Sequence, residues 1–377
     1  MNKIYLDNNS TTQIDPLVLE SMLPYFSEKY GNSSSQSHAF GWEARAAIDI
    51  AREQVANILN AESEEIIFTS GATESNNLAL LGYINSLSSN NSGIITSSIE
   101  HKAILDVCSR INKNGNNIFY IKPNKDGIID FKKVKNQINK NVKIISIMHA
   151  NNEIGTIQPI KKLGELCKDN NIIFHVDAAQ SLGKIKIDVK DMNIDLLSIS
   201  SHKIYGPKGV GALYIKNNIK IEPLIVGGGQ ENNIRSGTLA TPLIVGFGKA
   251  CDISLKKIDS ENKKIKKLSN NLIDGILNKY PDSKLNGSKE FRIPGNINFS
   301  FPFLKGMSII NSMPKLALSS GSACTSSSPS PSHVLKEIGV SKIDSNTSIR
   351  LGIGRFNTDK DIDIALESII NAIRNKI

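Results

Sequence analysis

Residues 142–177, VKIISIMHANNEIGTIQPIKKLGELCKDNNIIFHVD, decide the fold class. Two short apolar runs, at 142–149 and 172–177, flank a segment at 160–170 whose apolar residues follow helical spacing. A strand, a helix and a second strand in this order are typical of a parallel sheet that is covered by helices. Ligands bind at the carboxyl ends of such strands, so polar residues there are candidates for a functional site.

The same alternation extends through the first two thirds of the chain. Further apolar runs predict strands at 65–70, 93–98 and 194–200, and helix-like segments lie at 43–58, 74–88 and 101–114. After residue 257 the pattern changes to a long helix, strands near 296–301 and 347–353, and a final helix from 359.

The sequence therefore predicts an α/β protein with two domains. We expect a large domain at 15–257, in which a mainly parallel sheet is sandwiched between helices. Residues 1–14 and 258–377 are expected to form a smaller α+β domain. A chain of 377 residues exceeds the usual size of a single core, which agrees with this division.

Composition excludes several classes of protein. Apolar residues make up 40% of the chain and charged residues 21%, as in globular proteins, and no apolar stretch approaches the roughly 20 residues of a membrane span. The first residues lack the apolar region of a secretory signal, so we predict a cytoplasmic protein without membrane contact. The net charge is +9, but the lysines are scattered and aromatic residues are only 6%, so no nucleic-acid partner is expected. The four cysteines form no Cys-x-x-Cys pair, which argues for reduced thiols and no metal site.

Three features together predict a pyridoxal 5′-phosphate (PLP) site. In SISSHKIYGPKGVGALYI, 198–215, Lys203 follows a buried-looking strand; alone it would more simply be a solvated loop lysine. Asp177 ends the run IIFHVD, and a buried carboxylate there needs to face a cation. In FTSGATESNNLAL, 68–80, the strand breaks at Gly71 before a helix whose first N–H groups suit a phosphate. A lysine for the Schiff base, an aspartate for the pyridine nitrogen and a phosphate cradle are what PLP requires.

Motifs along most of the chain resemble those of the cysteine desulfurases of the NifS/IscS type. They are LDNNSTT, YGNSSSQSHAFG, FTSGATESNN, EHKAILD, MHANNEIGTIQPI, HVDAAQSLGK, SHKIYGPKGVGALY, GGGQENNIRSGT, SSGSACTS and SIRLGIGR, in this order from residue 6 to about 356. The resemblance implies a homodimeric fold-type I PLP enzyme that moves sulfur from L-cysteine to a protein cysteine and releases L-alanine. It also implies sulfur supply to acceptors such as an iron–sulfur scaffold, and to transfer RNA thiolation.

Residue roles follow from the resemblance, position by position. It makes Lys203 the Schiff-base lysine, Asp177 the partner of the pyridine nitrogen, and His101 an acid or base against the ring face. The remaining roles are hydrogen bonds to the phenolic oxygen or substrate (Asn152, Gln180), phosphate binding (Thr73, Ser200, His202, and Thr238 from the neighbouring subunit) and a clamp on the substrate carboxylate (Arg350). A guanidinium suits two carboxylate oxygens better than an ammonium does.

Cys324 lies in SSGSACTSSSPSPS, 319–332, a stretch with almost nothing that packs into a core. Taken alone it is an incidental surface cysteine, whereas the resemblance makes it the nucleophile that becomes a persulfide. A thiol that receives sulfur in a pocket and delivers it to another protein has to visit both places, and a serine- and glycine-rich backbone reorders at low cost. Cys108, Cys167 and Cys251 fall in helix-like segments and are expected to be buried.

Other functions stay open at this point. An aminotransferase or a selenocysteine lyase would share Lys203 and Asp177, although an aminotransferase has no use for a mobile cysteine. A sulfur-relay or scaffold protein would keep the fold without the chemistry. The sequence does not distinguish cluster assembly from transfer RNA thiolation, and it leaves open whether a scaffold docks on the short C-terminal region.

Overall fold

The computed structural model describes residues 3–88, 91–320 and 332–377. Its strands are β1 (Ile4–Tyr5), β2 (Ile66–Thr69), β3 (Gly93–Ser97), β4 (Asn117–Ile121), β5 (Val142–Ser146), β6 (Ile173–Asp177), β7 (Leu196–Ser200), β8 (Gly211–Ile215), β9 (Lys284–Leu285), β10 (Asn296–Ser300), β11 (Leu316–Ala317) and β12 (Ile349–Gly352). Its helices are α1 (Pro16–Met22), α2 (Pro24–Ser27), α3 (Ala39–Leu59), α4 (Ala72–Asn77), α5 (Tyr83–Asn85), α6 (Lys102–Lys113), α7 (Phe131–Gln137), α8 (Ile160–Asp169), α9 (Thr241–Lys279), α10 (His333–Glu337), α11 (Lys342–Asn346) and α12 (Asp359–Arg374). No helix among the described residues is long and apolar enough to cross a bilayer.

The centre of the large lobe is a seven-stranded sheet in the order β2-β8-β7-β6-β5-β3-β4. Strands β7, β6, β5, β3 and β4 pair in parallel, which confirms the predicted α/β class. Strand β8 runs antiparallel to both β7 and β2, so the sheet is mixed at one edge. Strand β8 was not predicted, because its five residues directly follow a glycine- and proline-rich loop and were read as part of it. The edge strand β4 was not predicted either.

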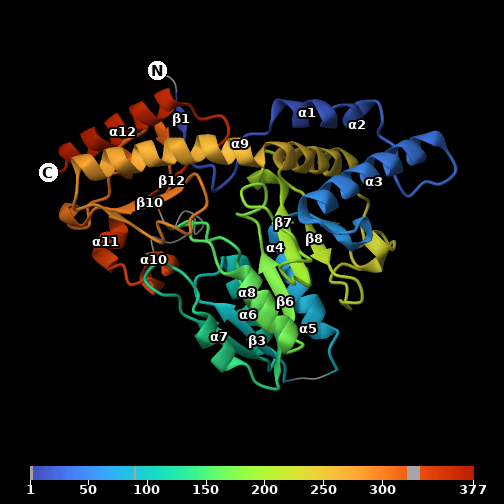
Figure 1. Ribbon diagram of the computed structural model, residues 1–377. Coiled ribbons are helices and arrows are strands. Elements are labelled where there is room, and N and C mark those ends of the chain that lie inside the picture. The colour runs from blue at the N-terminus through green and yellow to red at the C-terminus, as the bar shows by residue number, and fades with distance from the viewer. Residues whose placement is uncertain (1–2, 89–90, 321–331) are drawn as a thin grey trace.

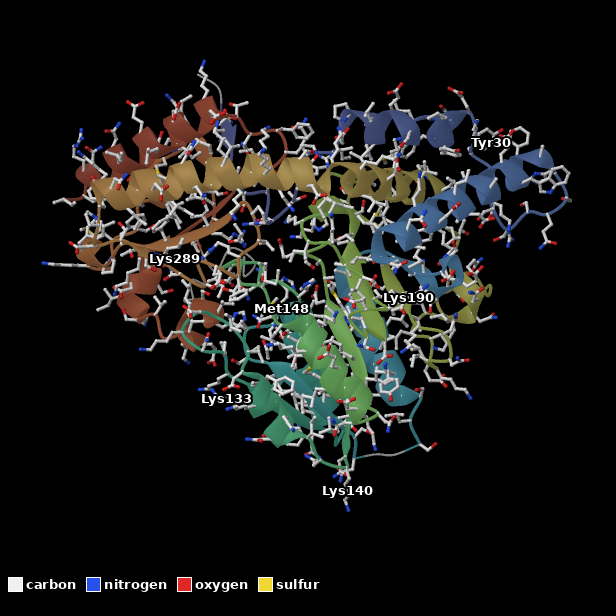
Figure 2. All side chains as sticks on the ribbon, viewed as in Figure 1. Tyr30, Lys133, Lys140, Met148, Lys190 and Lys289 are labelled. Atoms are coloured by element: carbon white, nitrogen blue, oxygen red, sulfur yellow. The ribbon has the colours of Figure 1, made fainter. Side chains whose placement is uncertain are left out.

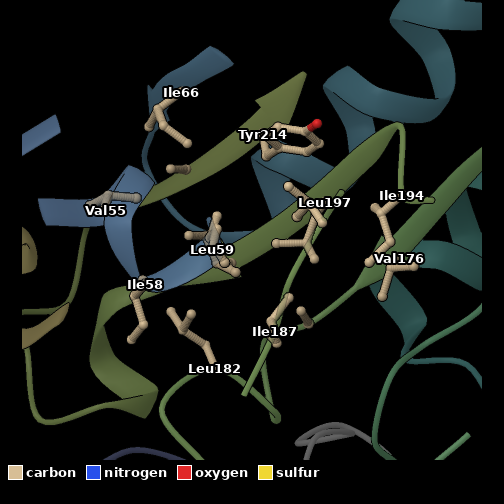
Figure 3. Packing of buried hydrophobic residues seen from close by; sticks show 14 of the residues in the cluster. Val55, Ile58, Leu59, Ile66, Val176, Leu182, Ile187, Ile194, Leu197 and Tyr214 are labelled. Carbon is tan, nitrogen blue, oxygen red and sulfur yellow. The ribbon is translucent and has the colours of Figure 1, made fainter. Parts of the chain in front are cut away.

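Neighbouring residues of each strand pack on opposite faces of this sheet, as the two-residue period of a strand requires. Ile145 and Leu197 belong to the core on the side of α3, α8 and the first half of α9, whereas Ile144 and Leu196 belong to the core beneath α6 and the helical turn Leu78–Gly82. Figure 3 shows part of the first core, where side chains of α3 face those of β2, β6, β7 and β8. The expected sandwich of helices, sheet and helices is therefore present.

A second lobe contains the three-stranded sheet β12-β10-β9, the short parallel pair β1 and β11, and helix α12. Its core combines Ile4 and Leu6 from the start of the chain with residues of α9, β10, β12 and α12. The first strand thus packs with the last third of the chain. In Figure 1 this lobe lies beside the large sheet, and α9 runs along both.

Helix α9 is 39 residues long and begins at Thr241, earlier than the sequence pattern indicated. Its side chains change partners along its length: Ile253 still belongs to the first core, and Ile265 belongs to the second. The domain limits at 257 and 258 stay a prediction, since the helix passes through them without a break. A straight helix of this length spans about 58 Å.

Candidate functional site

A cavity of about 420 Å³ lies at the carboxyl edge of the large sheet. Most of the predicted site residues line it: Thr73, His101, Asn152, Asp177, Gln180, Ser200, His202 and Lys203. Most of them lie at the end of a strand or in the segment that follows one. They meet because the carboxyl ends of β3, β5, β6 and β7 share one edge of the sheet. Met148 also lines the cavity, and Figure 2 shows it inside the molecule, whereas Lys133 and Lys140 project outward.

Lys203 is positioned by the turn Ser201–Lys203, which follows β7 directly. Its Nζ donates hydrogen bonds to the backbone carbonyls of Asn9 and Ser10, both at 2.7 Å. The Asn9 carbonyl also accepts a hydrogen bond from Nε2 of Gln180 at 2.8 Å. The N-terminal segment therefore closes one side of the site and holds the lysine amine at the cavity.

Asp177 is the last residue of β6 and is buried. Its Oδ2 accepts a hydrogen bond from Nδ2 of Asn76 at 2.8 Å, and its Oδ1 accepts one from the N–H of Ala179 at 3.0 Å. Both partners are neutral, and among the described residues no lysine or arginine forms an ion pair with it. A buried carboxylate in this setting is complementary to a cationic group inside the cavity.

The turn between β2 and α4 forms one wall of the cavity. Gly71 has φ of +150°, a value that favours glycine, and it leads into the first turn of α4 at Ala72 and Thr73. A Cβ on Gly211 would lie 2.7 Å from the Gly71 Cα, so β8 needs glycine where it passes this turn. The first N–H groups of a helix lack intrahelical partners, and Ala72 and Thr73 line the cavity together with Ser200.

His202 lies beside Lys203, and its Nδ1 is 3.0 Å from Oγ1 of Thr11. Burial, and then the positive charge of Lys203, lower the pKa of His202 to about 4. The imidazole is therefore neutral at pH 7 and suited to hydrogen bonding.

His101 caps the N-terminus of α6, directly after β3 and its following turn. Its Nδ1 accepts a hydrogen bond from the N–H of Ala103 at 3.1 Å, so in the neutral ring the proton is on Nε2. Burial lowers the pKa of His101; the charge of Lys203 lowers it further, whereas Asp177 opposes the shift. The neutral imidazole consequently carries a hydrogen-bond donor at Nε2, and its role as an acid or base stays a prediction.

Among the described residues, two of the predicted site residues do not line the cavity. Arg350, in β12, is 1% exposed and lies behind the wall, where its Nη1 donates to the carbonyl of Asn152 at 3.3 Å. Thr238 is exposed and does not line the cavity, and its role in a neighbouring subunit stays a prediction. Cys324 lies outside the described residues.

Two histidines and three cysteines are buried in the core, and for the cysteines burial was expected. His175 is fully buried between the hydroxyls of Ser146 and Ser198, and burial lowers its pKa to about 3. Burial lowers the pKa of His149 to about 4. The three described cysteines are buried and free: Cys108, Cys167 and Cys251.

Sequence reasoning missed the residues that support the site. Asn76 and Ser10 both lie in motifs that the sequence analysis named, but only the fold reveals their contacts. Asn76 contacts Asp177, and Ser10 contacts Arg350 and Lys203. Glu100 is fully buried, and its Oε1 accepts a hydrogen bond from the N–H of Met148 at 2.9 Å. Burial, reinforced by the negative charge of Asp177, raises the pKa of Glu100 to about 8, so this acid is protonated at neutral pH. The unusual Glu-His step after an apolar run was the available signal.

The residues fit PLP. An amine at Lys203, an otherwise uncompensated carboxylate at Asp177 and a helix N-terminus with the hydroxyls of Thr73 and Ser200 line one cavity, matching the aldehyde, pyridine nitrogen and phosphate of that cofactor. The volume also suits a small organic ligand.

Comparisons with known proteins agree with this arrangement. The family model described as aminotransferase class-V matches residues 4–365. The cysteine desulfurase IscS of Rickettsia bellii is 49% identical over 376 residues, covering 99% of this chain and 92% of the relative. A solved structure described as a NifS-like protein superposes with a TM-score of 0.92 at 34% identity, covering 99% of this chain and all of the other. A second, described as SspA in complex with cysteine, gives 0.84 at 38% identity, covering 94% and 100%.

Matches of this extent, together with a site that fits PLP, identify the family. The chain belongs to the class-V aminotransferase family and, within it, to the PLP-dependent cysteine desulfurases of the NifS/IscS type.

Proposed function

We propose that the protein is a cysteine desulfurase in which Cys324 is the sulfur acceptor. The reaction converts L-cysteine and the Cys324 thiol to L-alanine and a Cys324 persulfide. A sulfur–sulfur bond forms between Cys324 and the substrate sulfur, the substrate carbon–sulfur bond breaks, and the proton of the Cys324 thiol balances the hydrogen that the product carbon gains. The persulfide sulfur is then available to an acceptor protein.

One observation carries this proposal: both ends of the segment that contains Cys324 are attached next to the cavity. At one end, Ser319 pairs with the backbone of Arg350 through hydrogen bonds of 2.7 and 3.2 Å. At the other, Oγ of Ser332 donates to Oε2 of Glu153 at 2.5 Å. Arg350 and Glu153 both adjoin Asn152, which lines the cavity. The attachment at Ser319 precedes Cys324 by five residues of chain, and five residues span at most about 18 Å.

Helix α10, which follows Ser332, is fixed beside His101. Nε2 of His333 donates to the carbonyl of Glu100 at 3.0 Å, and Oγ of Ser98 donates to the carboxylate of Glu337 at 2.8 Å. Val334 and Leu335 pack with Ile99 in a small core of their own. These contacts support a site to which Cys324 has access.

The side chains around the cavity have distinct tasks in this proposal. When bound, PLP supplies an aldehyde that joins the substrate amine and a ring that withdraws electrons from its Cα. Lys203 removes the Cα proton and later returns one. The Cys324 thiol gives up the proton that the carbon losing sulfur gains, and His101 is the acid–base group at the cavity that assists this transfer. Asp177 holds a positive charge at the far end of the cavity.

The direct test is to incubate the purified, PLP-loaded protein with L-cysteine, with and without a reductant. Alanine, sulfide and the mass of the Cys324 peptide are measured together. We expect alanine to form without any keto acid, one added sulfur atom on Cys324 without reductant, and sulfide with reductant. A requirement for a keto acid would favour an aminotransferase, and turnover of selenocysteine alone would favour a selenocysteine lyase.

Replacing Asp177 with asparagine is expected to lower alanine formation about 10²-fold, the usual effect of removing a preorganised electrostatic partner. The amide of Asn76 and the N–H of Ala179 would then face a neutral group, and the cation in the cavity would lose its counter-charge. Initial rates and bound PLP are measured on the purified variant.

Asp195 provides the matched control for Asp177. It precedes β7 at the opposite edge of the same sheet, where its Oδ1 pairs with Lys216 at 2.9 Å. Asp195→Asn should leave the rate within about threefold, as expected for a pair far from the chemistry. Equal losses in both variants would argue against a special role of Asp177.

We also infer a homodimer. Exposed large apolar side chains gather on α1–α3 and the chain between them: Leu19, Leu23, Phe26, Tyr30, Phe40 and Trp42. Tyr30 projects from the end of the molecule that lies away from the second lobe (Figure 2). Such a patch on an isolated chain is typical of a protein interface.

The loop that contains Thr238 is the second feature that bears on a dimer. Arg235 pairs with Glu74 at 2.8 Å and so fixes this loop with Thr238 exposed, which supports the role of Thr238 in a second subunit. Sedimentation at several concentrations tests the dimer, and a monomer at all of them would contradict it.

The partner and compartment follow from the same proposal. We infer that the acceptor is a protein such as an iron–sulfur scaffold or a component of transfer RNA thiolation, because a persulfide is a carrier of transferable sulfur. We infer a cytoplasmic location, which the free, buried thiols of Cys108, Cys167 and Cys251 support.

A further inference from the structure

The N-terminal segment holds Arg350 as well as Lys203. We propose that Asp7 is a positioning residue for substrate binding, which orients the Arg350 guanidinium toward the carboxylate of the amino-acid substrate. This inference rests on the proposed function, and on the role that the family resemblance implies for Arg350, which is to bind that carboxylate.

The contacts of Arg350 leave part of its guanidinium available. Its Nη2 donates to Oδ1 of Asp7 at 2.9 Å and to Oγ of Ser10 at 2.5 Å, and its Nη1 donates to the carbonyl of Asn152 at 3.3 Å. A guanidinium has five N–H donors, and these contacts use three of them. Within the part of the chain that the structure describes, Nε has no hydrogen-bond partner although it is buried. The Nε–H and a second Nη1–H therefore remain for a ligand.

Asp7 supplies the negative charge that keeps this cation in place. Arg350 is 1% exposed, and a buried guanidinium without a paired anion is strongly unfavourable. Glu153 is also within electrostatic reach of Arg350, but its hydrogen bond goes to Ser332, and burial raises its pKa to about 7. Asp7 is thus the acidic partner that fixes the guanidinium directly, and an incoming carboxylate meets donors that are already oriented.

The same short segment sets the distance between the carboxylate site and the lysine. The side chains of Asp7 and Ser10 hold Arg350, whereas the backbone carbonyls of Asn9 and Ser10 hold the amine of Lys203. A substrate whose carboxylate is bound at Arg350 is therefore presented to Lys203 through a single turn of chain. A displaced guanidinium would therefore weaken substrate binding more than it would slow the proton-transfer step.

A second buried aspartate–arginine pair offers a matched control. Oδ2 of Asp15 lies 2.6 Å from Nη1 of Arg355, and both side chains are less than 10% exposed. This pair also joins the N-terminal segment to the chain that follows β12, but neither residue lines the cavity of the site. Arg355 contacts Glu261 and the ring of Tyr205 instead.

The experiment compares Asp7→Asn and Asp15→Asn in the full-length, PLP-loaded protein with L-cysteine as substrate. Asp7→Asn is expected to raise KM at least about tenfold, because it removes a charged hydrogen bond from the guanidinium, and to leave kcat within about threefold. Asp15→Asn is expected to leave both constants within about twofold while it lowers the unfolding midpoint. Asp7→Glu should restore part of the lost affinity.

A double-mutant cycle separates a positioning role from general destabilisation. If Asp7 acts through Arg350, Asp7→Asn should add little to the KM of Arg350→Lys. Ser10→Ala provides a second probe that does not depend on the folding of the Asp7 variants, and it should raise KM severalfold through the same guanidinium.

The outcomes are distinct. An unchanged or lower KM in Asp7→Asn and Ser10→Ala, or additive effects in the cycle, would overturn the inference. A fall in kcat that Asp15→Asn reproduces would do the same. If the wild-type protein forms no alanine from L-cysteine, the proposed function itself fails, whereas an active wild type with indifferent Asp7 variants refutes only the positioning role.

Discussion

Replacement of Lys203 with alanine is expected to reduce alanine formation from L-cysteine on the order of 10³-fold, within the range that a positioned acid–base group contributes. Nζ of Lys203 is held at the cavity by the carbonyls of Asn9 and Ser10, so its loss removes the amine that moves the Cα proton. In the proposed mechanism the same change also removes the lysine to which PLP would be joined. The rate is measured under single-turnover conditions, and the visible absorption of bound PLP is recorded alongside.

Lys208 is the control for this experiment, since it lines the same cavity. It is exposed, and Lys208→Ala should keep the rate within about threefold, as expected for a solvated charge. A Lys203 variant that retains a tenth of the activity, or a Lys208 variant with an equal loss, would remove Lys203 from the mechanism.

Replacement of Cys324 with alanine is expected to abolish persulfide formation and to reduce sulfur transfer at least about 10³-fold, as loss of a nucleophile does. The cofactor contacts involve other residues, so the absorption of bound PLP should not change. Mass spectrometry of the protein after reaction with L-cysteine, without reductant, reports whether a sulfur atom has been added.

Cys108 is the matched control among the described cysteines. Burial raises the pKa of its thiol to about 12, so it supplies almost no thiolate at neutral pH. Cys108→Ala should therefore keep persulfide formation intact. If sulfur appears on Cys108 in the wild type, or if the Cys324 variant transfers sulfur at the normal rate, the acceptor has been misassigned.

The convergence of the site residues was predictable from sequence because of one geometric rule. His101, Asp177 and Lys203 each follow an apolar run, and the ends of parallel strands β3, β6 and β7 meet at one edge of the sheet. Continuous apolar runs likewise predicted strands that are buried on both faces, as β3 and β7 are. The strand and helix pattern thus located the cavity before any contact was known.

Contacts between distant parts of the chain were not predictable in this way. Asp7 and Arg350 are far apart in sequence, and no local periodicity indicates that β1 and β12 bring them together. The position of Asn76 against Asp177 depends on how α4 packs on the sheet. The start of α9 was missed for a related reason: Gly246 and Gly248 weaken the helical signal, yet they are buried where the helix packs closely against Met22 and Ala51.

Helix α9 also has a mechanical consequence. A single rod that is embedded in both hydrophobic cores transmits force between the two lobes, so neither can swing as an independent unit without bending it or stripping its side chains from one core. Any conformational change during catalysis is therefore expected in the loops at the edge of the cavity, while the two lobes keep their relative position. Cleavage of the chain in the middle of α9 would leave two fragments that each expose apolar surface, and neither fragment is expected to fold alone.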